Sequence, residues 1–248
     1  MVTKGGWTPK RSLDRESRRA KAAKIAALIE QRRPIDGAEL LEIGTGAGII
    51  TSLLAERVGD DGSVWSVDIA DLRTVTQGYQ FRLVDGVELP FGDDSFDIVV
   101  SNHTIEHVGG PNAQRVHLQE IARVLRSDGV GYLASPTRWA LVEPHFKVPL
   151  LSWLPAGVRT PALRLTRRGS VYDISPRTRR ELLELIDDAS LRATEVTIEA
   201  LRVSARVEPG LATNLASSLP AALLDTTRPA IPTMIFLLGH DSRHHPLN

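Results

Sequence analysis

An apolar stretch that ends in three closely spaced glycines constrains the fold of this chain more than any other feature. Residues 39–43 read Glu-Leu-Leu-Glu-Ile, glycine follows at Gly44, Gly46 and Gly48, and a helix-like pattern continues to Val58. Glycine adopts positive φ angles and lets another group approach the backbone closely. A strand, a glycine turn and a helix N-terminus in this order predict the nucleotide-binding corner of an open α/β sheet.

The glycine spacing limits what this corner can bind. The dinucleotide fingerprint G-x-G-x-x-G needs its third glycine where Ile49 stands, and an acidic residue, Glu42, comes two positions before the first glycine. The corner therefore has room for a nucleoside with a small tail and shows no sign of a pyrophosphate cradle. A nicotinamide-dependent oxidoreductase is accordingly the weaker alternative.

Composition excludes several classes of protein. The chain has 248 residues, 42% of them hydrophobic, which is enough for a sizeable core. Its 30 basic and 30 acidic residues balance, so it lacks the charge of a general nucleic-acid binder. It has no cysteine, which excludes disulfides, thiolate metal sites and cysteine nucleophiles. Because no apolar run approaches the ~20 residues that span a bilayer, we expect a cytoplasmic protein.

Strand and helix patterns alternate through the first half of the chain, which predicts an α/β fold with a mostly parallel sheet and helices on both faces. We expect strands near 38–43, 63–68, 80–84, 96–101 and 129–134, and helices near 12–33, 47–58 and 111–126, the first with Ser12 as its N-cap. The segment from Asp68 to Asp85 is too short for a full helix and predicts only a turn or stub near 71–75.

The second half is less regular. Residues 135–175 are rich in Pro, Trp, Leu and Arg, and a long irregular segment at the carboxyl end of a strand is usually functional. We interpret it as a partly helical substrate cap inserted after the fifth strand. Ser175 and Pro176 predict the start of a helix, as N-cap and first helical residue. A strand near 192–201, a helix at 213–224 and a last strand at 232–238 complete the expected fold.

Five segments resemble, in order, the motifs of class I S-adenosylmethionine (SAM) methyltransferases: residues 42–48, 64–68, 84–91, 95–102 and 123–129. The resemblance covers roughly residues 36–135. It implies a Rossmann-like fold whose last two strands form an antiparallel edge pair, SAM as methyl donor, and methyltransferase activity. The implied organisation is an N-terminal helical extension, 1–34, and a methyltransferase domain, 35–248, with 135–175 as its cap.

The resemblance also implies the cofactor-binding residues. We expect Asp68 to bind the ribose hydroxyls and Asp85 the adenine amino group. The full set is Glu42, Gly44, Gly46, Gly48, Asp68, Asp85, Val87 and Asn102, with Val87 on the adenine face and Glu42 towards the methionine end.

Three histidines are candidate bases. His103, Glu106 and His107 are spaced i, i+3 and i+4, so they share one face if the segment is helical. Such a set suits a general base or a divalent metal, and a purely structural role is the third interpretation. We predict that His107, His103 and His145 are catalytic and that no metal is bound. His145 lies between a proline and aromatic residues, where it serves either as a base or in packing.

The expected reaction is O-methylation of a small or lipid-linked hydroxylated acceptor such as a glycan. Arg138 and Trp139 suit binding of a sugar ring, although core packing explains Trp139 equally well. The apolar residues of the cap also suit contact with a membrane face. The alternative is a non-catalytic SAM-binding module that acts through partners.

Overall fold

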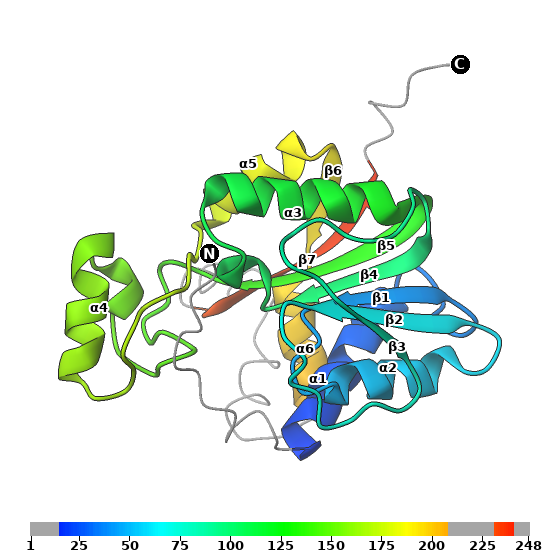
Figure 1. The fold of residues 1–248 in the computed structure, drawn as a ribbon, viewed down its shortest axis with the longest axis horizontal. Helices are drawn as coiled ribbons and strands as arrows, with labels where there is room; N and C mark the ends of the chain where they lie inside the picture. The colour runs from blue at the N-terminus through cyan, green and yellow to red at the C-terminus, as the bar shows by residue number, and fades with distance from the viewer. Residues whose placement is uncertain (1–14, 208–230, 241–248) are drawn as a thin grey trace.

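The computed structural model describes residues 15–207 and 231–240, and within them seven strands form one sheet in the order β3-β2-β1-β4-β5-β7-β6 (Figure 1). The strands are β1 (Glu39–Ile43), β2 (Ser63–Asp68), β3 (Gln80–Leu83), β4 (Phe96–Asn102), β5 (Leu125–Pro136), β6 (Leu191–Glu195) and β7 (Thr233–His240). In this sheet β7 runs opposite to the other strands, and it pairs antiparallel with both β5 and β6. The mostly parallel sheet and its antiparallel edge pair are thereby confirmed.

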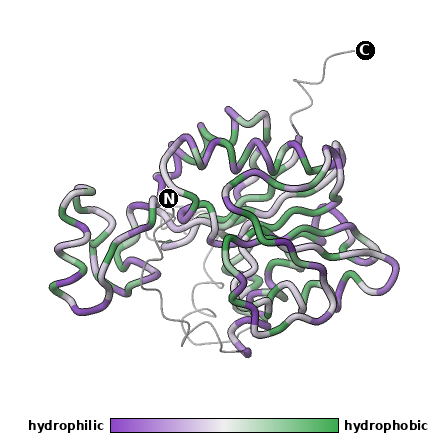
Figure 2. The backbone as a smooth tube through the Cα atoms, in the orientation of Figure 1, coloured by the Kyte–Doolittle hydropathy of each residue, from purple (hydrophilic) through white to green (hydrophobic). Residues whose placement is uncertain are grey.

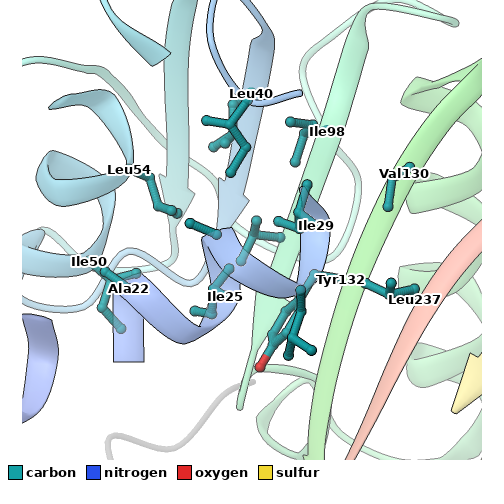
Figure 3. Close-up of a cluster of buried hydrophobic side chains, with 14 of the residues drawn as sticks. Ala22, Ile25, Ile29, Leu40, Ile50, Leu54, Ile98, Val130, Tyr132 and Leu237 are labelled. Atoms are coloured by element: carbon teal, nitrogen blue, oxygen red, sulfur yellow. The ribbon is translucent and has the colours of Figure 1, made fainter. Parts of the chain in front are cut away.

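Helices cover both faces of the sheet (Figure 1). They are α1 (Arg15–Ile29), α2 (Ile49–Val58) and α6 (Thr197–Val207) on one face, and α3 (Pro111–Val124) and α5 (Arg179–Asp188) on the other. Successive strand side chains point to opposite faces, so Leu40 joins the first core cluster and Leu41 the second. Figure 3 shows the first cluster, where Ile25 and Ile29 of α1 lie against Leu40 and Ile98 of the sheet. Hydrophobic residues are concentrated along the central strands (Figure 2).

Residues 137–175, here called the cap lobe, follow β5 and form a separate extension. They contain the short helices η3 (Leu151–Trp153) and α4 (Ala156–Leu165), and a small core of Val148, Leu151 and Leu163. In Figure 1, α4 lies at one end of the molecule, away from the sheet. Another short helix, η2 (Ile105–His107), lies outside the cap lobe and follows β4. The insertion after the fifth strand and its partly helical character are confirmed, and the lobe begins at residue 137 because β5 continues to Pro136.

The prediction for residues 192–201 is wrong beyond residue 195. β6 ends at Glu195, and α6 follows in place of a longer strand. The β-branched residues here favour a strand locally. However, Val196, Ala200 and Val203 are spaced i, i+4 and i+7, and all three are buried in the core on the α1 side. Tertiary packing of this helical stripe therefore overrides the local preference.

The predicted start of the next helix is also wrong. α5 begins after Thr178, whose side chain accepts a hydrogen bond from the Glu181 N–H, while the Glu181 side chain accepts from the Thr178 N–H. This capping box satisfies two exposed backbone donors, which Ser175 and Pro176 do not do. Ser175 instead donates its N–H to the Glu106 carbonyl oxygen, at 2.8 Å.

The remaining boundaries agree with the predictions to within a few residues. α1 ends at Ile29 and not at residue 33. The stretch between β2 and β3 contains no helix, as its length predicted. The expected helix at 213–224 and the N-cap Ser12 lie outside the described residues.

Candidate active site

The glycine corner lies where the strand order of the sheet reverses. β1 pairs with β2 on one side and with β4 on the other, and the chain crosses in opposite directions from these two strands. In open α/β sheets, ligands bind at such a switch point, outside the carboxyl ends of the strands. Gly48, with φ 78°, is the N-cap of α2. The predicted corner is therefore at the expected edge of the sheet.

The three glycines of the corner differ in what they face. A Cβ at Gly44 would overlap the Thr104 side chain, and one at Gly48 would overlap the Val75 carbonyl and the Tyr79 hydroxyl. A Cβ at Gly46 would meet nothing within 4 Å. Gly44 and Gly48 thus allow the protein to pack on itself, and Gly46 borders the open space that a ligand needs.

Asp68 points into this corner. Its Oδ2 accepts a hydrogen bond from the Gly46 N–H at 2.8 Å, and its Oδ1 accepts from the Ile69 N–H at 2.7 Å. The carboxylate is half-buried at the end of β2 and retains lone pairs for further donors. An open backbone surface at Gly46 beside an oriented carboxylate fits a nucleoside with ribose hydroxyls.

Glu42 lies beneath the corner. Its side chain is buried and accepts a hydrogen bond from the Thr51 hydroxyl of α2. Burial raises the pKa of Glu42 to about 8, against the opposing effects of the Thr51 hydrogen bond and the charge of Arg18. A carboxyl with such a pKa is largely protonated at neutral pH.

The other predicted cofactor residues lie at the same edge of the sheet. Asn102 is the last residue of β4, in register with Ala134 of β5. Asp85 and Val87 follow β3, the former exposed and the latter half-buried. Their contacts with a cofactor remain predictions.

Substitution of Gly48, which packs against the protein, and of Gly46, which faces open space, should have different effects on stability and binding. Gly48→Ala should destabilise the fold by about 2–4 kcal/mol, because it combines a left-handed backbone with overlap against a carbonyl. Gly46 also has a positive φ, but a Cβ there would meet open space. The stability loss of Gly46→Ala should therefore be smaller, and its main effect should be weaker ligand binding. Urea unfolding and calorimetry with S-adenosylhomocysteine (SAH) measure the two effects. Equal destabilisation by both substitutions would contradict these contacts.

Beside the corner, histidines and carboxylates gather at the carboxyl ends of β4 and β5. His103 has φ 57°, and Thr104 donates its hydroxyl to the Ile43 carbonyl at 2.9 Å, which ties this segment to the corner. His103 Nδ1 lies 3.1 Å from Oε1 of Glu106, which is completely buried. Burial opposes ionisation of Glu106, but hydrogen bonds with His103 and His145 outweigh it, so its pKa lies below the usual range.

The ionised Glu106 fixes the tautomer of His103. A carboxylate only accepts hydrogen bonds, so His103 Nδ1 carries the proton and Nε2 is left as the acceptor of the ring. The His103 side chain is 27% exposed, so it can reach both the buried carboxylate and an incoming group. This is the arrangement of an oriented general base.

His145 plays a different electrostatic role. Its Nδ1 lies 2.9 Å from Glu143 Oε1, and its Nε2 lies 3.4 Å from Glu106 Oε1 and 3.3 Å from His107 Nε2. Burial would lower the pKa of His145, but hydrogen bonds and charge from the two glutamates raise it well above its ordinary value. His145 is thus an imidazolium that donates from both nitrogens. His107, on the exposed side, accepts from it.

The cluster carries a net negative charge and one unfilled acceptor. Two carboxylates and one imidazolium leave one negative charge beside the corner, and Glu106 Oε2 is buried without a hydrogen-bond partner among the described residues. His103, Glu106 and His145 each offer one ligand atom within 4.8 Å of the others. To hold a cation, His145 would first have to lose one of its two ring protons, because a protonated nitrogen has no lone pair for a metal. The set that the sequence spacing offered for a metal was His103, Glu106 and His107, so the structure exchanges His107 for His145.

The sequence interpretation grouped Glu106 with His103 and His107 without listing it as catalytic, and it gave Glu143 no role. In the structure each of the two glutamates contacts a histidine. Glu143 precedes His145 by two residues, with Pro144 between them. An acid and a histidine held close together by a proline are a sequence signal that could have identified Glu143. Trp139 is 45% exposed, so core packing does not account for it.

Comparison with known proteins agrees with this geometry. A family model described as "Methyltransferase domain" matches residues 41–133. Ubiquinone biosynthesis O-methyltransferase of Parvibaculum lavamentivorans is 28% identical over 137 residues, which cover 50% of this chain and 52% of that protein. The protein of the same name from Rhizobium etli is 28% identical over 162 residues, 59% of this chain and 64% of the relative. The chain thus matches roughly half to two thirds of the length of these relatives.

Solved structures share the fold over most of the chain. A chain from the complex between the Haloferax volcanii Trm112 methyltransferase activator and a methyltransferase gives a TM-score of 0.57 at 20% identity, with 96% of this chain and 98% of that chain covered. Burkholderia thailandensis 1,6-didemethyltoxoflavin-N1-methyltransferase, solved with SAH, gives 0.55 at 17% identity over 94% and 82%. The methyltransferase domain model thus matches residues 41–133, and the solved structures share the fold of the whole sheet.

Proposed function

We propose that the protein transfers the methyl group of SAM to a hydroxyl oxygen of a small or lipid-linked acceptor, such as a glycan. The observation that supports this most directly is the oriented His103–Glu106 pair beside the glycine corner. A hydroxyl is a poor nucleophile until a base takes its proton, whereas many amines need no such base. The two relatives named above are O-methyltransferases by name.

In this proposal, different residues bind SAM, take the acceptor proton and orient the base. Gly46 and Asp68 would hold the nucleoside of SAM, with Glu42, Gly44, Gly48, Asp85, Val87 and Asn102 completing its site. SAM supplies an activated methyl group on a sulfonium. His103 Nε2 takes the acceptor proton, and Glu106 holds the ring and stabilises the imidazolium that results. His145 and His107 order the wall of the cluster, and its net negative charge favours a cationic donor.

The cap lobe supplies the acceptor side in this proposal. It follows β5 directly, and His145 and Glu143 bring its first part into the histidine cluster. Arg138 lies over the Trp139 ring, 5.6 Å from its centroid, and both are near the start of the lobe. An exposed indole beside a guanidinium suits a polar ring that stacks and accepts hydrogen bonds.

A labelled methyl group tests the reaction. The protein is incubated with methyl-labelled SAM and a panel of hydroxylated acceptors, namely a catechol, a free sugar and a polyprenyl-linked sugar, each paired with its amino analogue. Label in a hydroxyl compound supports the proposal. Label only in the amines contradicts the base assignment, and SAH binding without any labelled product identifies a non-catalytic SAM-binding module.

Asp68→Ala should weaken SAH binding by roughly 10- to 150-fold, or about 1.5–3 kcal/mol, the loss of a hydrogen bond to a charged group. Calorimetry measures the affinity. Asp71→Ala is the matched control, because Asp71 is an exposed acid three residues away whose partner is Arg73. Unchanged affinity in the Asp68 variant would show that the nucleoside binds elsewhere.

A further inference from the structure

The cap lobe exposes an unusual share of large apolar side chains. Of the twelve that the described residues expose, eight lie in these 39 residues. They are Trp139, Leu141, Val142, Leu150, Trp153, Val158, Leu165 and Val171. Contiguous exposed apolar surface marks an interaction site in most soluble proteins.

Five of these side chains come from one small structural unit. Leu150 donates its N–H to the Leu141 carbonyl at 2.9 Å, and Val142 bridges to Pro149. The rings of Trp139 and Trp153 meet edge to face, with centroids 5.4 Å apart. Backbone pairing and ring contact therefore hold these apolar groups together.

Helix α4 contributes two more of the exposed apolar side chains. Val158 and Leu165 are seven residues apart, so they lie two turns apart on the same side of the helix. Leu165 is 87% exposed. The lobe does not need these side chains for its own folding, because Val148, Leu151 and Leu163 already form its core.

The lobe is also basic. It contains Arg138, Lys147, Arg159, Arg164, Arg167 and Arg168 against Glu143 and Asp173, a net charge of +4, whereas the whole chain has a net charge of zero. Lys147, Arg164, Arg167 and Arg168 are exposed, and Glu143 is buried. Hydrophobic and hydrophilic residues alternate along the lobe in Figure 2. The same 39 residues thus expose both positive charge and large apolar groups.

We infer that the cap lobe docks on the surface of an anionic lipid bilayer. Its apolar side chains would enter the headgroup boundary while its exposed arginines meet lipid phosphates. The Trp153 indole suits this boundary, because its N–H is already bonded to the Ala140 carbonyl at 3.1 Å and its ring is exposed. Among residues 15–207 and 231–240, no helical segment combines the length and the hydropathy of a bilayer span.

The position of the lobe suits this partner. α4 projects at one end of the molecule, away from the sheet (Figure 1). His145, at the base of the lobe, reaches the histidine cluster. If the proposed methyl transfer is correct, an amphiphilic acceptor could pass from the bilayer to that cluster. This last step rests on the proposed function, and the docking itself does not.

Co-sedimentation with vesicles tests the docking. Phosphatidylcholine vesicles are compared with vesicles containing one quarter phosphatidylglycerol. We expect the wild type to bind the anionic vesicles at least about tenfold more tightly, with an affinity that falls as salt rises. Val158→Glu combined with Leu165→Glu should weaken this binding by at least about tenfold. Leu83→Glu, an exposed leucine on β3, is the matched control and should bind as the wild type does.

Three results would overturn the inference. The first is an absence of vesicle binding by the wild type, and the second is equal binding by the wild type and the double variant. The third is a wild type that is a dimer in light scattering and a double variant that is a monomer, which would make this face a contact between two copies. SAH calorimetry on every variant separates the two proposals. Vesicle binding with SAH binding but no methyl transfer removes the proposed reaction and leaves the docking intact.

Discussion

Replacement of His103 by glycine should lower the turnover number for methyl transfer by roughly 10²- to 10⁴-fold while leaving SAH affinity nearly unchanged, because the substitution removes a general base and no proposed SAM contact. Glycine is the suitable replacement, since position 103 has φ 57° and glycine adopts that angle without strain. Single-turnover assays with labelled SAM measure the chemical step directly. Calorimetry with SAH measures the cofactor site in the same preparation.

Two controls separate a base from a structural histidine. His107→Ala should reduce turnover far less, because His107 Nε2 faces the His145 imidazolium and cannot take a proton from the acceptor. Added imidazole should partly restore the glycine variant, since it can occupy the vacated space. Wild-type activity should survive chelators. Activity that is lost with a chelator and restored by a divalent cation would instead assign His103, Glu106 and His145 to a metal, contrary to our expectation.

Much of the fold could be predicted because its signals are local. The strand at β1, the glycines and the first residues of α2 are consecutive, so their order alone indicates the corner. The errors come where a distant partner decides the structure. Residues 197–207 form a helix because α1 and the sheet offer a surface on which Ala200 and Val203 are buried, and no local preference reveals that surface.

In the candidate site, too, local sequence signals were informative, and contacts between distant residues could not be predicted. The resemblance implied Asp68 and Gly46 as neighbours in the cofactor site, and they meet in a hydrogen bond. The sequence assigned all three glycines to the cofactor site, and it could not reveal that Tyr79, 31 positions after Gly48, occupies the space where a Cβ of that glycine would lie. Likewise, His145 joins Glu106 from 39 positions away. Spacing predicts which residues end neighbouring strands, and it does not predict which side chain fills the space between them.

A second large effect is expected in the pH dependence of stability, through Glu42. Its ordinary pKa is 4.5, and burial raises the pKa in the folded protein to about 8. The folded state therefore holds a proton that the unfolded state releases, so the stabilising contribution is complete below pH 4.5 and is lost as pH rises towards 8. At about 1.4 kcal/mol for each pKa unit, the loss reaches up to roughly 5 kcal/mol.

Glu42→Gln should remove this dependence, because an amide keeps the acceptor for the Thr51 hydroxyl and does not ionise. Urea unfolding at pH 5, 6.5, 8 and 9 should show the wild type losing stability across the range and the variant losing less, so that the variant is the more stable protein at pH 9. The raised pKa of His145 adds a slope of the same sign to both proteins, so the difference between them isolates Glu42. Thr51→Val should extend the loss of stability to higher pH, since the Thr51 hydrogen bond is one of the influences that lower this pKa. Parallel curves for the wild type and the glutamine variant would mean that Glu42 is ionised in the folded protein, and that its charge is balanced by Arg18 on α1.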